Sequence, residues 1–282
     1  MPSPADAGAP AAKLVPLQVV PLRRPALWAA STLVVVAVVA LLVSIWRNPN
    51  IQHSVILDYQ FAPAILAGLR TTIVIALLAA VLGVALGTLL AVMRLSDSGV
   101  LRLGSGLYIW CVRGTPLLVQ ILVWGNLALL FETIGPFKTN ALITPFIASV
   151  LALGLNEAAY MAEIVRAGIL AIDHGQAEAA TALGMTRALA LRRVILPQAL
   201  KVIIPPWGNQ FISLLKATSL VSVIAGGDLL TAATNISSGN LRTLELLLVA
   251  TFWYLAITSV TSVAQYAIER RLARSTARTH GR

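Results

Sequence analysis

The chain has 282 residues, of which 58 % are hydrophobic and only 11 % are charged, whereas soluble proteins carry about 25 % charged residues. Together with a mean hydropathy of +0.84, these values exclude an ordinary cytosolic enzyme, a disordered chain and a fibrous repeat, and they indicate an integral membrane protein. The single cysteine, Cys111, excludes an internal disulfide framework and a cysteine-based zinc cluster.

Three long stretches carry no charge, at residues 27–46, 71–93 and 246–268. Each is long enough to cross the hydrocarbon as a helix, which takes about 20 apolar residues. The first follows two arginines, but it is too long for a signal-peptide core and lacks a clear cleavage site, so we expect it to be retained. The second carries Gly83 and Gly87 four residues apart, a spacing that lets helices approach closely. Packing within the chain is the favoured interpretation of this pair, ahead of a dimer contact.

Three further spans are expected, and they are more polar. They cover residues 108–131, 145–170 and 206–230. Their ionisable side chains are Arg113 in the first, Glu157, Glu163 and Arg166 in the second, and Lys216 and Asp228 in the third. In the first of the three, Arg113 is expected within about two turns of the cytoplasmic end. Ionisable side chains inside a span cost about 2.5–3.5 kcal/mol each, so they normally face a cavity or a partner.

The distribution of basic residues predicts the orientation of these six spans. With the N-terminus in the cytoplasm, fourteen of the 21 lysines and arginines fall on the inner side and three on the outer side, with the other four in or beside spans. This bias favours six spans with both termini cytoplasmic. It also accounts for the net charge of +10 by anchoring at an anionic leaflet, without any nucleic acid.

The polar segment at residues 173–206 is expected on the cytoplasmic side. It is rich in alanine and leucine, and residues 176–183 are predicted to form a short helix. Gly184 stands where a helix ends in the left-handed conformation, and Thr186 can cap a second helix that should stop before Pro197. Pro205 and Pro206 are then expected to break the chain before the next span. Taken alone, the segment fits a surface loop with amphipathic helices equally well.

The same segment resembles the EAA loop of bacterial ABC-importer permeases. The resemblance rests on Glu178-Ala179-Ala180, Gly184, Val194 and Leu196-Pro197, with valine in place of the usual isoleucine at 194. Further segments resemble the polar amino acid branch of that family, namely RGTPLLVQ at 113–120, AYMAEIVR at 159–166, PQA at 197–199 and KATSL at 216–220. The resemblance covers roughly residues 60–272, and it departs at Ala217, where the family often has an acid.

The resemblance implies an all-α integral membrane protein of the type I ABC-importer permease class, which imports polar amino acids or related solutes such as opines. The bacterial inner membrane is the implied location. The implied partners are two ABC ATP-binding subunits, a second permease that is identical or related, and an extracytoplasmic solute-binding protein. In that family the EAA loop docks on the ATPase, which implies a coupling role for Glu178, Ala179, Ala180, Gly184, Leu196 and Pro197.

The implied domain organisation has four parts. A mobile cytoplasmic tail covers residues 1–26, and an additional N-terminal transmembrane helix with its outer loop covers residues 27–60. A five-helix permease core with its EAA loop covers residues 61–272, and a basic cytoplasmic tail covers residues 273–282.

The chain itself is not expected to be an enzyme. It contains no G-x-x-x-x-G-K-[ST] phosphate-binding loop, and no soluble segment is long enough for a nucleotide-binding domain, since domains start at about 50 residues. ATP and magnesium are therefore expected on a partner subunit. No nucleophile–base set, metal-ligand spacing or other cofactor motif is evident, so we expect no metal or cofactor in this chain.

The intramembrane polar residues fall into two groups. Glu163 and Arg166 stand three residues apart and can pair on one helix face, so with Arg113 they are interpreted as structural contacts. Glu157 lies on another face, and for it we predict a place on the substrate path. An acid could bind the ammonium of an amino acid, and Lys216 or the hydroxyls of Thr218 and Ser219 could bind its carboxylate.

Two other classes of function stay open at this point. One is an ion-coupled secondary carrier or channel, which often shows inverted repeats that are not evident here. The other is a membrane scaffold or sensor, in which residues 173–206 would bind a regulator.

Overall fold

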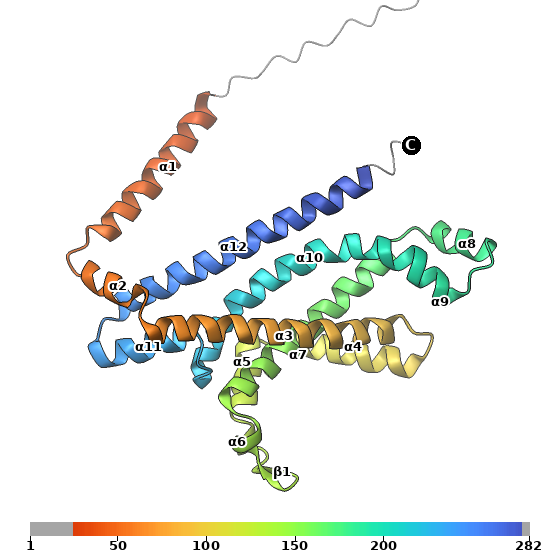
Figure 1. Ribbon diagram of the computed structural model, residues 1–282, viewed down its shortest axis with the longest axis horizontal. Helices are drawn as coiled ribbons and strands as arrows, with labels where there is room; N and C mark the ends of the chain where they lie inside the picture. The colour runs from red at the N-terminus through yellow and green to blue at the C-terminus, as the bar shows by residue number, and fades with distance from the viewer. Residues whose placement is uncertain (1–24, 278–282) are drawn as a thin grey trace, which may run out of the picture. The chain divides into compact units, whose positions relative to one another are not determined.

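The computed structural model describes residues 25–277 (Figure 1). By its internal contacts the chain divides into two units, Met1–Ile51 and Gln52–Arg282. In the first unit, α1 (Pro25–Trp46) is a 22-residue helix, and its described side chains are exposed along the whole helix. At about 1.5 Å per residue it can span a bilayer, as predicted for residues 27–46. Most of the predicted tail at residues 1–26 lies outside the described residues.

The second unit is almost entirely helical. Its helices up to the hairpin are α2 (His53–Gln60), α3 (Pro63–Leu95), α4 (Gly99–Gly114), α5 (Leu117–Gly125) and the 3-10 turn η1 (Leu127–Leu129). Two short antiparallel strands follow, β1 (Thr133–Ile134) and β2 (Phe137–Lys138), with Thr133 opposite Lys138. The remaining helices are α6 (Thr139–Leu142), α7 (Pro145–Leu170), α8 (His174–Ala182), α9 (Arg187–Ala190), the π-helical turn η2 (Leu191–Ile195), α10 (Leu196–Ala217), the 3-10 helix η3 (Thr218–Ile224), α11 (Leu229–Asn240) and α12 (Thr243–Ala277).

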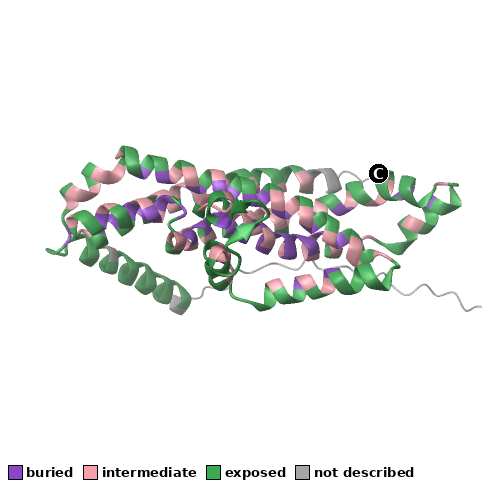
Figure 2. Ribbon diagram, turned by 90° about the horizontal axis from the view of Figure 1, so that it is seen from below, coloured by how far each residue is buried: buried purple, intermediate pink, exposed green. Residues whose placement is uncertain are grey.

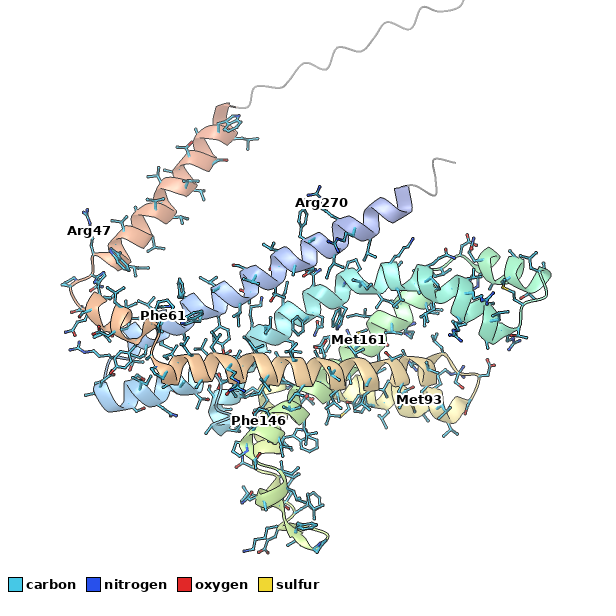
Figure 3. All side chains as sticks on the ribbon, viewed as in Figure 1. Arg47, Phe61, Met93, Phe146, Met161 and Arg270 are labelled. Carbon is cyan, nitrogen blue, oxygen red and sulfur yellow. The ribbon has the colours of Figure 1, made fainter. Side chains whose placement is uncertain are left out.

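Helices α3 and α7 form the centre of this unit, because glycines let their backbones approach. A Cβ atom on Gly83 would lie 2.5 Å from Glu157 Cγ, and one on Gly87 would lie 2.6 Å from Met161 Cβ. Met161 lies in the interior of the bundle (Figure 3), and buried residues are concentrated along the middle of the unit (Figure 2). The Gly83/Gly87 spacing therefore serves packing within the chain, as the sequence favoured.

The short helix α2 is attached to the beginning of α12. Gln52 N donates to Glu245 Oε1 at 3.1 Å, and Trp253 Nε1 donates to Gln60 O at 2.8 Å. Phe61 meets Trp253 edge to face, with ring centroids 5.7 Å apart. Helix α3 begins at Pro63, eight residues before the predicted apolar stretch at 71–93, and proline fits its first turn.

Among the described residues, four helices are long and apolar enough to cross a membrane, or up to six if each of two bent helix pairs counts as one span. Residues 145–170 form α7 with the predicted bounds. Residues 71–93 and 246–268 lie within the longer helices α3 and α12. The second unit is thus an all-α membrane bundle, and α12 continues through residues 273–277 of the predicted basic tail.

The chain does not form one continuous helix over residues 108–131, where a single span was expected. The chain there forms α4 and α5, which are bent by 99°. Helix α4 begins at Gly99, nine residues earlier than predicted, and ends at Gly114. Pro116 causes the break, since it lacks the N–H group that would continue the helix.

Helix α9 ends at Ala190, before Pro197 as predicted, but the predicted break at Pro205 and Pro206 is wrong. Pro197 lies in the first turn of α10, where proline is tolerated, and α10 then runs through Pro205 and Pro206 to Ala217. Neighbouring helices can stabilise proline inside a membrane helix, and here Gln265 Nε2 of α12 donates to Pro205 O at 3.4 Å. The break falls later, where Ala225 is left-handed and Asp228 caps α11.

We expect Gly87→Val to destabilise the bundle, because the added side chain has no room between α3 and α7. Overpacking of this kind costs about 1–3 kcal/mol. The matched control is Gly104→Val in α4, since nothing lies within 4 Å of a Cβ atom built there. The thermal midpoint of each variant is measured on the purified protein in detergent. Equal midpoints for the two variants would contradict the packing role of Gly87.

Candidate functional site

Local capping explains the helix pair α8–α9. The Asp173 carboxylate accepts a hydrogen bond from Gly175 N at 2.6 Å and begins α8. Gly184 has φ +75°, Met185 N donates to Ala180 O at 3.0 Å and Gly184 N donates to Thr181 O at 2.9 Å. These two bonds satisfy the last carbonyls of α8 in the Schellman arrangement. Thr186 Oγ1 then accepts from Leu189 N at 3.4 Å and begins α9, so the predicted helix, glycine turn and cap are confirmed.

An exposed groove of about 680 Å³ lies between α8 and α9. The residues that line it are Ala177, Glu178, Thr181, Ala182, Arg187, Ala190, Leu191 and Ile195. Of the six residues for which the sequence predicts a coupling role, Glu178 lines the groove, Ala180 is buried, and Ala179, Gly184, Leu196 and Pro197 are exposed around it. A bond from Gln198 Nε2 to Gln176 Oε1 at 3.1 Å holds α8 to the beginning of α10. The structure therefore presents a small-residue surface of fixed shape.

Two side chains replace the backbone hydrogen bonds that are lost at the α4–α5 bend. In a continuous helix the N–H of residue 116 would donate to Val112 O, but Pro116 has none. Gln120 Nε2 donates to Val112 O instead, at 2.8 Å, and Thr115 Oγ1 donates to Cys111 O at 3.0 Å. An unsatisfied carbonyl in hydrocarbon costs several kcal/mol, so these two side chains make the bend possible.

A polar cavity of about 280 Å³ lies where α5, α7 and α10 meet. It is lined by Thr115, Leu117, Leu153, Asn156, Glu157, Tyr160, Gln210, Ser213, Leu214 and Ala217. Glu157 is only 2 % exposed, and its Oε2 accepts from Gln210 Nε2 at 3.0 Å. Its other oxygen, Oε1, is buried with no hydrogen-bond partner among the described residues. A buried acceptor of this kind is suited to a donor group from outside the chain, since it is costly when unpaired.

A second, larger cavity of about 830 Å³ adjoins the first and shares Tyr160, Gln210 and Ser213 with it. It extends along α7 to Ala171. Arg113 and Glu163 line this cavity, and the Arg113 guanidinium carbon lies 5.2 Å from the centroid of the Tyr160 ring. The two cavities therefore share part of their lining between α7 and α10.

Some of the polar residues lie where the sequence predicts and others do not. Arg166 and Glu163 form the expected ion pair, with Nη2 to Oε2 at 2.9 Å. Arg113 lies in the last turn of α4 rather than near the beginning of a span, because the helix starts at Gly99.

The residues predicted to act with Glu157 are not brought to it. Lys216 is exposed in the last turn of α10, Thr218 Oγ1 donates to Leu215 O at 2.7 Å, and Ser219 Oγ donates to Lys216 O at 2.8 Å. None of the three lines either polar cavity.

The sequence analysis missed Gln210, Ser213 and Tyr160 as neighbours of Glu157. A signal for two of them was present, since Gln210 and Ser213 stand three residues apart and so share one face of an apolar helix. Asp228, expected inside a span, instead caps α11 by accepting from Leu230 N at 2.9 Å. Among the described residues, no group of three or more His, Cys, Asp or Glu side chains could hold a metal ion.

A membrane bundle with polar side chains in cavities between its helices and a separate capped helix pair has the construction of a transport permease. Residues 83–274 match the family of the binding-protein-dependent transport system inner membrane component. The chain belongs to this family, the membrane-spanning subunits of ABC importers. This membership favours an importer permease over an ion-coupled secondary carrier or channel.

Three similar proteins are informative. The arginine transport system permease protein ArgU of Corynebacterium glutamicum is 41 % identical over 278 residues, covering 96 % of this chain and 88 % of the relative. The L-cystine transport system permease protein TcyB of Bacillus subtilis is 39 % identical over 224 residues, covering 79 % of this chain and 92 % of the relative. A chain in the crystal structure of an amino acid ABC transporter with histidines is 41 % identical, with a TM-score of 0.68. The match covers 76 % of this chain and 96 % of that chain. The structure therefore has the type I importer permease fold.

We expect Gln210→Leu to destabilise the protein, because it leaves both oxygens of the buried Glu157 carboxylate without a described partner. Loss of a partner to a buried acceptor costs about 1–3 kcal/mol. The control is Ser213→Ala on the same helix face, which removes only a bond from Ser213 Oγ to Asn209 O. The measurement is the thermal midpoint in detergent, and a Gln210→Leu midpoint at or above that of the control would contradict this role of Gln210.

Proposed function

We propose that this chain is the permease subunit of an importer for amino acids that carry a cationic group, and that Glu157 binds that group inside the membrane. The observation that carries the proposal is the buried Glu157 carboxylate, which has one oxygen bonded to Gln210 and the other without a described partner in a polar cavity. The printed names of the relatives, among them an arginine permease, support this class of solute.

The cavity fits one end of such a solute. An ammonium or guanidinium group brings several N–H donors, and a carboxylate that accepts from a charged donor forms one of the stronger hydrogen bonds in proteins. The adjoining cavity, lined by Arg113, offers a cation for the carboxylate of the same solute or for its passage. This assignment replaces Lys216, Thr218 and Ser219 as partners of Glu157, because none of them reaches either cavity.

The energy comes from outside this chain in our proposal. Two ABC ATP-binding subunits hold ATP and magnesium and dock at the α8–α9 groove on the cytoplasmic side, and a solute-binding protein delivers the solute on the other side. A second permease subunit, identical or related, completes the membrane part. The excess of arginine and lysine supports cytoplasmic termini and a cytoplasmic α8–α9 pair in a bacterial inner membrane. The exposed alanines and the fixed glycine turn support the docking role.

We expect Glu157→Gln to abolish most transport while the protein still folds, since the side chain keeps its size and loses its charge. Loss of a hydrogen bond to a charged partner costs about 1.5–3 kcal/mol, so the KM for uptake of a cationic amino acid should rise at least tenfold. The measurements are uptake into proteoliposomes and solute-stimulated ATP hydrolysis by the complete importer. The control is Glu132→Gln, which changes an exposed acid. Unchanged uptake and stimulation in Glu157→Gln would rule out the substrate role.

We expect Gly184→Trp to insert and fold but to lose ATP-driven uptake, because a bulky residue with φ +75° distorts the turn between α8 and α9. Gly99→Trp is the matched control, since open space surrounds that glycine. The same vesicles, tested with collapsed ion gradients and with and without the ATPase subunits, distinguish an importer from an ion-coupled carrier. Normal uptake in Gly184→Trp would remove the coupling role of this turn.

A further inference from the structure

The side chain of Gln120 connects two features of the fold that lie apart in the sequence. Its amide nitrogen donates to Val112 O at 2.8 Å and lies 3.2 Å from Thr115 O, both at the α4–α5 bend. Its amide oxygen accepts from Asn156 Nδ2 of α7 at 3.1 Å. Helices α5 and α7 lie next to each other in the bundle (Figure 1). One side chain therefore bridges the bend and the residue directly before Glu157.

Only one orientation of the Gln120 carboxamide satisfies these hydrogen bonds. The carbonyl oxygens at the bend accept hydrogen bonds and cannot donate, so Gln120 must present its nitrogen to them. The Gln120 oxygen then faces Asn156, so the Asn156 amide nitrogen must donate to it. The carboxamide of Asn156 is thereby fixed with its oxygen left over, and among the described residues no donor reaches that oxygen. Since Asn156 lines the polar cavity and is 9 % exposed, this oxygen is an acceptor that it can offer to a solute.

We propose that Gln120 is a positioning residue that gives the Glu157 cavity a second free acceptor, by fixing the Asn156 carboxamide through the bend. The cavity then offers Asn156 Oδ1 as well as Glu157 Oε1, and it favours a solute group with several N–H donors over a neutral group of the same shape that also carries an acceptor. Without Gln120 the Asn156 amide can turn over and serve either kind of group. This inference rests on the proposed function, since it concerns how the same cavity selects its solute.

The test compares arginine with citrulline, whose ureido group has the shape of the guanidinium group but is neutral and carries a carbonyl oxygen. Affinities are measured by equilibrium dialysis with the purified complete importer in the absence of the binding protein. We expect the wild type to prefer arginine, and Gln120→Met to lose that preference by on the order of tenfold. Asn126→Leu is the control, because Asn126 Nδ2 donates only to Leu122 O within α5, and it should keep the preference.

A double-mutant cycle separates positioning from general damage. If Gln120 acts through Asn156, then Asn156→Ala should lose the preference by a similar factor, and the double variant should be no worse than either single one. Effects that multiply in the double variant would overturn the proposal, as would an unchanged preference in Gln120→Met.

If Gln120→Met fails to assemble, Asn156→Asp tests whether the bond between Gln120 and Asn156 positions the Asn156 side chain. The aspartate cannot donate to Gln120 as the amide does, while the carbonyls at the bend stay satisfied. We then expect weaker arginine binding despite the added acid, and stronger arginine binding would overturn the proposal. A wild type that binds no arginine would instead contradict the proposed class of solute, so the two failures can be told apart.

Discussion

The constraint on which this structure depends is that every backbone polar group inside the hydrocarbon must find a partner. Two helix pairs of the second unit are bent. At both bends, side chains form hydrogen bonds with the backbone groups that the helix leaves unpaired. At the α4–α5 bend Thr115 and Gln120 satisfy the freed carbonyls. At the beginning of α11, Asp228 accepts from Leu230 N at 2.9 Å and Thr72 Oγ1 accepts from Leu229 N at 2.9 Å. Much of the polar content of the bundle is therefore needed by the backbone itself.

Features with a local cause could be predicted from the sequence. Residues 27–46 form a helix long enough to cross, because an uninterrupted apolar run of the right length has few alternatives in a membrane. Residues 145–170 form one helix with the predicted bounds, although this helix carries Glu157, Glu163 and Arg166. The α8–α9 turn was also predictable, since Asp173, Gly184 and Thr186 act on backbone groups within a few residues of themselves. Composition predicted an integral membrane protein, and the resemblance to importer permeases implied the class of fold.

Features that depend on distant partners could not be predicted. Pro116 breaks its helix, whereas Pro205 and Pro206 lie inside α10, and the local sequence does not distinguish the two cases. The same holds for the site. Glu157 could be recognised as an acid inside a span, but its partner Gln210 is 53 residues away, and Lys216 is exposed on α10 instead of lining the cavity.

The position of the polar cavity follows from these two kinds of contact. Gly83 brings α3 so close to Glu157 that a Cβ atom would lie 2.5 Å from its Cγ, so one side of the acid is sealed by backbone packing. The other side faces the bend, where α5 turns away from α4 and leaves room next to α7. The break that the backbone has to compensate thus lies in the wall of the cavity that holds Glu157, since Thr115 and Leu117 line it. Broken helices also form the binding sites of other membrane transporters.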